Sequence, residues 1–425
     1  MSEAKAAVVL AFEDARSLVE EHASHLTPGA TETLDLLQAA GRVLAETVTA
    51  DRDIPPFPRS TRDGYAVRAS DLTSFPVRLA VKGEIKAGPS PGGVPSEVHP
   101  GEAFSIMTGA PVPQGADAVV MVEYTSLYKD CVEITRGTSP GENIVPQGAE
   151  AKGGEVLLKK GTRLNEAAIA LAASVGKARL NVFQRPRIAV LTTGDEIVPV
   201  EAEPGFAQIR NSNSFSLAVQ IQQAGGEAVL LPIAPDEPRR LRQLIEQGLQ
   251  SDLLLMTGGV SMGRYDLVEQ VLVELHVEFF FNGAKIQPGR PVVFGRVQCG
   301  ADATAREVLA KPSHKYFFGL PGNPVSTMVT FELFARPLLE ALAGMAAQPL
   351  MFLHARMKSD LRVKPGLKRF LPAILSGKYE ETQVEIVPWQ GSGDVAARSR
   401  SNCYLVIAED REQIYAGEWV SVMLR

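Results

Sequence analysis

The segment 252–269, DLLLMTGGVSMGRYDLVE, joins an apolar run to a glycine turn and then to a helical pattern. The run 253–256 is short and continuous, as in a strand that is buried on both faces of a sheet. Gly258 and Gly259 allow a tight turn and a close approach of the backbone to a ligand, and Ser261 stands at the expected helix N-cap. Because several N–H groups and the helix dipole would converge on this turn, the segment predicts an anion site in an α/β fold.

A lone glycine turn of this kind more often only connects a strand to a helix. Asp266, one turn into the predicted helix, adds a carboxylate at the rim of the anion site, which suits a divalent cation between the carboxylate and the anion. The choice between these two interpretations depends on the neighbouring turns, which contribute further polar groups.

The turn TTGDEIVP follows another apolar run, at residues 187–191. It provides Thr193, Gly194, Asp195 and Glu196. In open α/β sheets ligands collect beyond the carboxyl ends of the strands, so these groups are predicted to face the anion site. The two carboxylates are the hard oxygen ligands that Mg²⁺ requires, and they are candidate metal ligands together with Asp266.

Two more turns carry charge or a stiff backbone. KIQPGRP places Lys285 and Arg290 around a Pro-Gly turn. FFGLPGNPVST enters a helix through four residues that restrict or free the backbone, namely Pro321, Gly322, Asn323 and Pro324. Because proline fixes φ and glycine permits a sharp bend, this loop is expected to have its shape before a ligand binds. Four such turns in one α/β segment favour a binding site over simple connections.

These motifs, in this order, resemble the molybdopterin molybdenumtransferase family, which is called MoeA in bacteria and is related to the E domain of gephyrin. The stretches that carry the resemblance are TTGDE, TGGVSMG-x-x-D, P-G-R-P and GLPGNPVS. PPFPRSTRDGYAVR, MTGAPVPQGADAVV and GENI extend it over nearly the whole chain. What the resemblance implies can therefore be stated for the complete sequence.

The resemblance implies a cytoplasmic transferase that inserts molybdenum from molybdate into adenylylated molybdopterin, with Mg²⁺ as cofactor, and releases AMP. It also implies a homodimer, in which each pocket is shared between the α/β domain of one subunit and the β domain of the other. The molybdopterin adenylyltransferase is an expected partner. Two alternatives stay open, namely a molybdopterin adenylyltransferase and a non-catalytic scaffold like gephyrin. Molybdate and tungstate are not distinguished, because both are tetrahedral dianions of similar size.

The composition is that of a soluble globular protein, with 425 residues, 45% of them hydrophobic and 22% charged. This length exceeds one ordinary core, so several domains are expected. No apolar run reaches the roughly 18 residues of a membrane span, and the net charge of −6 argues against general nucleic-acid binding. The 3 isolated cysteines provide no disulfide or metal framework and fit a reducing, cytoplasmic compartment.

Two helices are expected near the N-terminus, over residues 8–25, where apolar residues recur at helical spacing, and over residues 32–45. His22 and His25 lie three positions apart, as metal ligands could, but no cysteine or third histidine accompanies them, and an exposed helix face explains them. By resemblance, residues 1–50 and 148–185, with a further helix within 161–176, form an elongated helical domain.

Short apolar runs between glycines and prolines predict an inserted β domain over residues 51–147. Asp63 lies in an Asp-Gly turn and Thr108 in a Thr-Gly-Ala turn, and by default both are ordinary turn residues. The resemblance makes both of them catalytic residues, together with Glu196 and Asp266.

The sequence departs from the family pattern at two places in this region. Thr61 and Arg62 precede Asp63, where the family has a small residue and a methionine. Val145 stands after the GEN motif, where the family has an arginine. A cationic contact is therefore missing there or is supplied by another residue.

Alternating strand and helix patterns predict a parallel sheet with helices on both faces over residues 186–345, the molybdopterin-binding α/β domain of the family. Helices are expected at 213–224, 237–249, 265–275 and 325–342. Residues 346–425 show short β runs with glycine and proline turns, which predict a C-terminal β-barrel domain. By resemblance, Arg369 and Ser392 in this domain contact the substrate.

Overall fold

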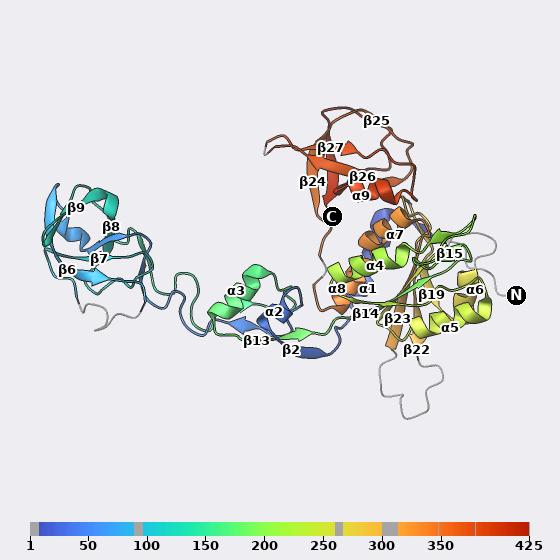
Figure 1. Ribbon diagram of the computed structural model, residues 1–425, viewed down its shortest axis with the longest axis horizontal. Helices are drawn as coiled ribbons and strands as arrows, with labels where there is room; N and C mark the ends of the chain where they lie inside the picture. The colour runs from blue at the N-terminus through green and yellow to red at the C-terminus, as the bar shows by residue number, and fades with distance from the viewer. Residues whose placement is uncertain are drawn as a thin grey trace, which may run out of the picture.

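The computed structural model describes residues 8–88, 97–259, 267–299, 313–346, 348–378 and 380–424. Ser261 and Asp266 therefore lie outside the described residues. A small β domain stands at one end of the longest axis, a narrow segment with two short helices follows, and an α/β domain stands at the other end, beside a C-terminal β domain (Figure 1). Within the described ranges, no helix is long and apolar enough to cross a membrane.

The α/β domain is built on a six-stranded sheet with the order β17-β14-β18-β23-β22-β19. The first four strands in this order run parallel, and the last two pair antiparallel. Their bounds are β17 (Glu227–Leu230), β14 (Arg187–Thr192), β18 (Leu253–Thr257), β23 (Ser313–Leu320), β22 (Val293–Cys299) and β19 (Glu278–Phe281).

The expectation of a parallel sheet is thus confirmed for four strands, and the edge differs because β22 runs antiparallel to both of its neighbours, β23 and β19. Parallel neighbours need a long crossover, which is usually a helix. Helices follow β14, β17 and β18, whereas the described residues between β19 and β23 contain no helix. Without crossover helices, β22 and β19 join the edge of the sheet through antiparallel pairings.

Helices cover both faces of this sheet, as expected. One core cluster packs residues of α4 (Asn213–Gln223) and α8 (Arg336–Leu342) against one face. A second cluster packs α5 (Pro238–Gly248) and α6 (Leu267–Glu274) against the other face. The expected helix 325–342 is continuous but changes type, because α7 (Pro324–Thr330) passes into α8 through a π-helical turn, Phe331–Ala335.

The N-terminal helix α1 (Phe12–Ser24) packs against the α/β domain, whereas the resemblance places residues 1–50 in the helical domain. Phe12 contacts the rings of Phe334 and Phe370, at centroid distances of 6.0 and 5.2 Å. The preceding strand β1 (Val9–Leu10) pairs with β20 (Gly283–Ala284), just before the KIQPGRP turn. The start of the chain therefore supports one of the charged turns.

The helix expected over residues 32–45 is wrong. Residues Thr31–Asp35 form β2, which pairs antiparallel with β13 (Arg179–Phe183), and only α2 (Leu36–Ala39) is helical. Along β2 exposed and half-buried residues alternate, as in a strand with one covered face. The ladder to β13 satisfies the backbone polar groups of β2, so a distant strand overrides the local pattern. The helix expected within 161–176 is confirmed as α3 (Glu166–Ser174).

The inserted β domain contains a six-stranded sheet with the order β8-β5-β7-β6-β10-β9. This sheet confirms the β structure expected from the short apolar runs. The bounds of its strands are β5 (Gly64–Val67), β6 (Val77–Ile85), β7 (Glu102–Ile106), β8 (Ala118–Met121), β9 (Thr125–Tyr128) and β10 (Cys131–Ile134).

The C-terminal β-barrel is also confirmed. Five strands close a ring through the pairings β26–β27, β27–β24, β24–β30, β30–β28 and β28–β26. Their bounds are β24 (Phe352–Met357), β26 (Lys368–Ser376), β27 (Gln383–Ile386), β28 (Cys403–Ile407) and β30 (Trp419–Leu424). A short strand from the α/β domain, β21 (Ile286–Gln287), pairs with β26 and ties the two domains together.

Candidate active site

The glycine turn after β18 packs directly on the turn after β14. Gly258 has a φ of 88°, and a Cβ atom at this position would lie 2.3 Å from the Thr193 carbonyl oxygen. A Cβ atom on Gly259 would lie 2.9 Å from the Thr193 hydroxyl oxygen, and one on Gly322 would lie 3.5 Å from the Gly258 Cα. Only glycine fits at positions 258 and 259. The turns that follow three adjacent parallel strands therefore meet at one place, as predicted.

Asn213, the first residue of α4, ties these turns together. Its Nδ2 group donates to Thr257 Oγ1 at 2.9 Å and to the Gly322 carbonyl oxygen at 2.7 Å. Thr257 Oγ1 in turn donates to the Pro321 carbonyl oxygen at 3.1 Å, which also accepts from Thr327 Oγ1 at 2.5 Å. Sequence reasoning missed Asn213, because an asparagine at a helix start is an ordinary residue there.

Two buried polar atoms beside these turns have no hydrogen-bond partner among the described residues, namely Thr193 Oγ1 and Asn213 Oδ1. Thr193 is 2% exposed and Asn213 is 8% exposed. Leaving a buried polar group unsatisfied costs about 1–3 kcal/mol. Because both donor hydrogens of Asn213 are already engaged, its amide orientation is fixed and its oxygen stays available as an acceptor. These two atoms are suited to contact a ligand at the turns.

Carboxylates gather at the outer side of the same edge. Asp195 and Glu196 are exposed, and Glu196 folds back toward Gly194, where a Cβ atom would lie 2.5 Å from Glu196 Oε2. The Asp236 backbone N–H donates to Asp195 Oδ1 at 3.0 Å. Removal from water and the negative charges of Asp195 and Glu196 raise the pKa of Asp236 above its usual value. Sequence reasoning missed Asp236, which lies 40 positions from the TTGDE motif in a connection without a signature.

Asp195 and Glu196 are carboxylates, which are hard oxygen ligands of the kind that Mg²⁺ takes. The negative charges of Asp195 and Glu196 repel the Asp236 carboxylate. A bound divalent cation would relieve this repulsion. No group of three or more His, Cys, Asp or Glu residues is arranged to hold a metal in the part of the chain that the structure describes. Mg²⁺ commonly takes one or two protein carboxylates and completes its shell with phosphate oxygens and water. Asp195 and Glu196 would hold it, with Asp266 outside the described residues.

Cations lie on the barrel side of the same turns. The Lys285 carbonyl oxygen accepts from the Lys368 N–H at 3.0 Å, which places Lys285 beside β26 and its Arg369. A Cβ atom on Gly289 would lie 2.4 Å from Thr330 Cγ2, so the turn that carries Arg290 rests on α7. Lys285 and Arg290 are exposed. Positive charge therefore borders the helix that follows the Pro-Gly-Asn-Pro loop.

Arg369 is a nearly buried cation, with 6% of its surface exposed. Its guanidinium Nη1 donates to the Leu367 carbonyl oxygen at 3.1 Å, and it forms no ion pair with any described residue. Burial lowers the pKa of Arg369 from its usual value. A buried guanidinium without a carboxylate is stabilised by an anion. The Ser392 carbonyl oxygen accepts from the Val325 N–H at 2.9 Å, so the barrel contacts the start of α7.

Asp63 and Thr108 form a separate pair in the β domain. Asp63 Oδ1 accepts from the Thr108 N–H at 2.6 Å and from Thr108 Oγ1 at 2.9 Å, and both residues are exposed. These two hydrogen bonds lower the pKa of Asp63. A Cβ atom on Gly64 would lie 1.9 Å from the Val120 carbonyl oxygen, so glycine is required beside Asp63. Within one chain this pair lies at the opposite end of the molecule from the α/β turns (Figure 1).

Comparison with known proteins finds matches over most of the chain. Residues 10–176 match the MoeA N-terminal region (domain I and II), residues 189–341 match a probable molybdopterin binding domain, and residues 354–424 match the MoeA C-terminal region (domain IV). The chain belongs to the MoeA family. Its relatives include the molybdopterin molybdenumtransferase of Haemophilus influenzae, which is 33% identical over 97% of this chain and 98% of the relative.

Two further members of the MoeA family support the assignment. The molybdopterin molybdenumtransferase of Nostoc sp. (strain PCC 7120) is 36% identical over 92% of this chain and 88% of its own length. The crystal structure of the molybdopterin biosynthesis moeA protein from Pyrococcus horikoshii has a TM-score of 0.76 and 29% identity, over 98% of this chain and 100% of that chain. The fold is therefore the MoeA fold over the whole length of the chain.

The structure bears on one departure from the MoeA pattern. Val145, which stands where the family has an arginine, lies in β11 (Ile144–Val145) opposite Arg59 of β4 (Arg59–Ser60). Arg59 Nη2 forms an ion pair with Glu150 Oε1 at 2.9 Å. The guanidinium of Arg59 therefore lies on the strand that pairs with β11, opposite the position where the family has an arginine.

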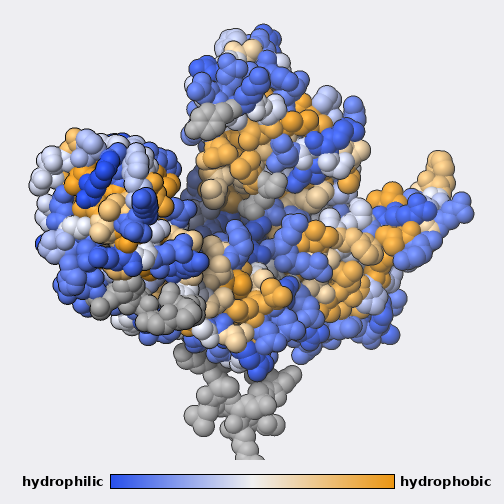
Figure 2. Space-filling model, turned by 60° about the vertical axis from the view of Figure 1, so that its left-hand side comes forward, coloured by the Kyte–Doolittle hydropathy of each residue, from blue (hydrophilic) through white to orange (hydrophobic). Residues whose placement is uncertain are grey.

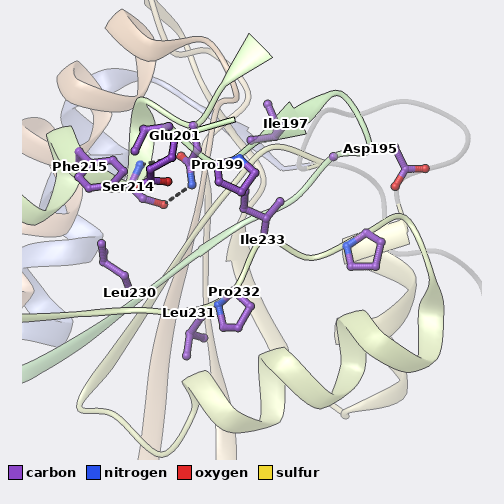
Figure 3. A pocket seen from close by; sticks show the side chains of 14 residues that line it. Asp195, Ile197, Pro199, Glu201, Ser214, Phe215, Leu230, Leu231, Pro232 and Ile233 are labelled. Carbon is purple, nitrogen blue, oxygen red and sulfur yellow. Dashed lines mark hydrogen bonds between the residues drawn. The ribbon is translucent and has the colours of Figure 1, made fainter. Parts of the chain in front are cut away.

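A pocket of about 550 Å³ adjoins the TTGDE turn. It lies beyond the carboxyl ends of β14 and β17 and beside the start of α4 (Figure 3). Most of its walls are apolar, and Asn211 and Ser214 contribute polar atoms that bond to each other at 2.9 Å. Sequence reasoning did not identify this pocket, because its wall from β17 and the following loop carries no motif.

Proposed function

We propose that this chain is a molybdopterin molybdenumtransferase, which inserts molybdenum from molybdate into adenylylated molybdopterin and releases AMP. The observation that carries the proposal is the edge of the α/β sheet, where a glycine turn suited to phosphate lies between carboxylates on one side and cations on the other. Both substrates are anions, which backbone N–H groups and cations bind. Curated relatives that match nearly the full chain bear this name.

In this proposal the N–H groups of the turn at Gly258 and Gly259 bind the diphosphate, with Ser261 as a further donor. The remaining substrate contacts come from Thr193, Gly194 and the loop 321–324. During turnover the phosphoanhydride bond breaks with addition of an oxygen atom from water, and AMP leaves. The two dithiolene sulfurs replace oxygen ligands of molybdate, which leave as water after protonation. No covalent enzyme intermediate is needed, so positioning is the main contribution of the protein.

Lys285, Arg290 and Arg369 are proposed to bind molybdate, with Ser392 at the edge of the same group. The nearly buried Arg369 supports this role, because it lacks a carboxylate partner among the described residues. The carboxylates Asp195, Glu196 and Asp266 are proposed to hold Mg²⁺. When bound, Mg²⁺ neutralises charge on the phosphate oxygens and on the departing AMP.

We also infer that the chain acts as a cytoplasmic homodimer, in which Asp63 and Thr108 of one copy complete the α/β site of the other. The distance between these regions in one chain supports this arrangement (Figure 1). Apolar surface on the barrel and on the α/β domain could be covered in a dimer (Figure 2), and exposed apolar side chains include Met351 and Val219. A contact with the molybdopterin adenylyltransferase would deliver the adenylylated substrate.

The two alternative functions require different parts of the chain. A molybdopterin adenylyltransferase needs only the α/β domain, whereas matches to MoeA also cover residues 10–176 and 354–424. A non-catalytic scaffold has no need of an ionised carboxylate such as Asp63, which two hydrogen bonds keep at a lowered pKa. Both observations favour the transferase.

The test incubates the purified protein with adenylylated molybdopterin, Mg²⁺ and either molybdate or tungstate, and follows AMP and metal-bound cofactor. The proposal predicts AMP release that depends on the oxyanion, with formation of the metal-bound product. Consumption of ATP and free molybdopterin would instead assign the chain as an adenylyltransferase. Binding of substrate without any turnover would support the scaffold.

A further inference from the structure

A second cavity lies where α1, α8, the narrow segment with α2 and α3, and the connection from α8 to the barrel meet. Its volume of about 370 Å³ lies within the roughly 300–1,000 Å³ that is usual for small-molecule sites. α1 and α8 lie on the side of the α/β domain that faces the narrow segment (Figure 1). The cavity is therefore a junction between domains.

This junction is separate from the candidate active site. Arg163, which lines the cavity, donates to the carbonyl oxygen of Gln223 at the end of α4, whereas Asn213 at the start of α4 bonds to the glycine-containing turns. α4 has 11 residues, which span about 16 Å. A ligand of the cavity is thus distinct from the substrates of the sheet edge, and the inference below does not rest on the proposed function.

The lining of this cavity holds more positive than negative charge. Its ionised side chains are Arg16, Arg163, Arg336, Glu332 and Glu340. Both carboxylates bond to one guanidinium, because Arg336 Nη1 lies 3.0 Å from Glu332 Oε2 and Arg336 Nε lies 2.7 Å from Glu340 Oε1. The negative charge of the lining is therefore bonded to Arg336, which leaves two further guanidinium groups facing the same space.

Arg163 is half-buried and forms no ion pair with any described residue. Removal from water and the positive charges of Arg336 and Arg185 lower the pKa of Arg163, and Glu340 offsets them only in part. Arg16 is 7% exposed, pairs with Glu20 Oε1 at 2.6 Å and donates to the Leu333 carbonyl oxygen at 2.6 Å. Because a guanidinium has five N–H donors, Arg16 and Arg163 both keep donors for an anion.

The rest of the lining comes from an irregular backbone segment and from apolar side chains. Glu332 belongs to the π-helical turn between α7 and α8, and turns of this type are frequent at functional sites. Met351 and Leu424 are 72% and 42% exposed, so a ligand would cover apolar surface that water now contacts. The apolar lining residues are Pro337, Met345, Pro349, Leu350, Met351 and Leu424.

We propose that this cavity binds a small anion with an apolar body, whose carboxylate or phosphate group pairs with Arg16 and Arg163. Guanidinium groups bind both kinds of group through paired, charge-assisted hydrogen bonds. Arg163 belongs to the narrow segment and Arg16 to α1, which packs on α8, so the anion joins the narrow segment to the α/β domain. The two parts already fit closely here, since a Cβ atom on Gly344 would lie 2.3 Å from Phe183 Cδ2. A bound anion therefore stiffens this junction.

Calorimetric titration with phenyl phosphate, benzoate and benzyl alcohol tests the site. The first two probes carry the phosphate or the carboxylate on the same apolar ring, and the third is its neutral counterpart. At least one of the two anions should bind about tenfold or more tightly than benzyl alcohol, which corresponds to 1.4 kcal/mol. Arg163→Gln should abolish this preference. Arg185→Gln is the matched control, because Arg185 is an exposed cation near Arg163 that does not line the cavity.

Two further measurements keep the test decisive if Arg163→Gln fails to fold. Arg163→Lys keeps the charge but loses the planar fork, and should bind the anion several-fold more weakly than wild type. In the wild-type protein the anion should slow hydrogen exchange at residues 160–163 and 348–351. Lys285→Gln, at the candidate active site, should leave this binding unchanged. Equal affinity for all three probes, loss of binding in Lys285→Gln but not in the Arg163 variants, or slowed exchange only at residues 257–259 would overturn the proposal.

Discussion

The turns at the edge of the α/β sheet and the Asp63–Thr108 pair of the β domain are built in different ways. The three α/β turns contact one another through glycines and are joined by hydrogen bonds among Asn213, Thr257 and Pro321. The β-domain pair consists of two hydrogen bonds on an exposed turn. One region brings three turns into direct contact, whereas the other is an oriented carboxylate that faces solvent. The difference supports the proposal that Asp63 acts on a group that its own chain does not bring to it.

The largest expected effect follows from replacing the charge at Asp63. Asp63→Asn keeps the size of the side chain but removes its charge, and should lower oxyanion-dependent AMP release by roughly 100- to 1,000-fold. AMP affinity and thermal stability should stay near wild type, because the α/β turns do not depend on this residue. Asp130→Asn, at an exposed aspartate of the same domain, is the control. Normal turnover of Asp63→Asn would remove Asp63 from the site.

A smaller effect is expected at the hydrogen-bond network of the α/β turns. Thr257→Val removes the donor to Pro321 and the acceptor for Asn213 at a fully buried position. It should cost about 1–3 kcal/mol in the free energy of unfolding, because buried partners lose their bonds. It should also weaken AMP binding, which calorimetry measures.

The control for this substitution is Thr330→Val. Thr330 is equally buried, but its hydroxyl bonds only to carbonyl oxygens of its own helix. Its replacement should cost less stability and leave AMP affinity unchanged. Equal effects of the two substitutions would mean that the network does not organise the site.

The prolines of the neighbouring loop should have a moderate effect on affinity alone. Replacing Pro321 and Pro324 with alanine lets the unfolded chain and the free loop sample more conformations, at roughly 0.4–1 kcal/mol per site. The double variant should bind the pterin substrate or the oxyanion several-fold more weakly and recover turnover at high substrate concentration. Titrating each substrate separately measures this effect. Wild-type affinity for both would show that the loop has another role.

The smallest effect concerns Asp236. Its pKa is raised in the folded protein, so its contribution to stability is present at acid pH and is lost as the pH rises through the folded pKa. Asp236→Asn should therefore melt slightly above wild type at neutral pH and like wild type in acid. Melting curves with and without Mg²⁺ test this, since the cation should raise the melting temperature of wild type more than that of the variant. A variant that melts below wild type at neutral pH would contradict the assigned repulsion.

The turns after β14, β18 and β23 could be predicted from sequence because glycine, proline and carboxylates sit in short motifs at strand ends. Asn213 and Asp236 could not, since each acquires its role from partners that are distant in sequence. The prediction of a helix over 32–45 is wrong for a similar reason. Residues 31–35 form a strand because they pair with β13, which lies about 150 residues away in the sequence. Ser261 and Asp266 remain predictions, outside the described residues.

The central claim is that the site combines regions from two copies of the chain, and complementation tests it most directly. Asp63→Asn and Glu196→Gln are each expected to be inactive, and are co-expressed with different affinity tags and purified over both tags. Each mixed dimer then contains one site with both substitutions and one with neither, so roughly half of the wild-type AMP release should return. Mixed dimers that stay as inactive as the single variants, or the absence of any mixed dimer, would contradict the shared site.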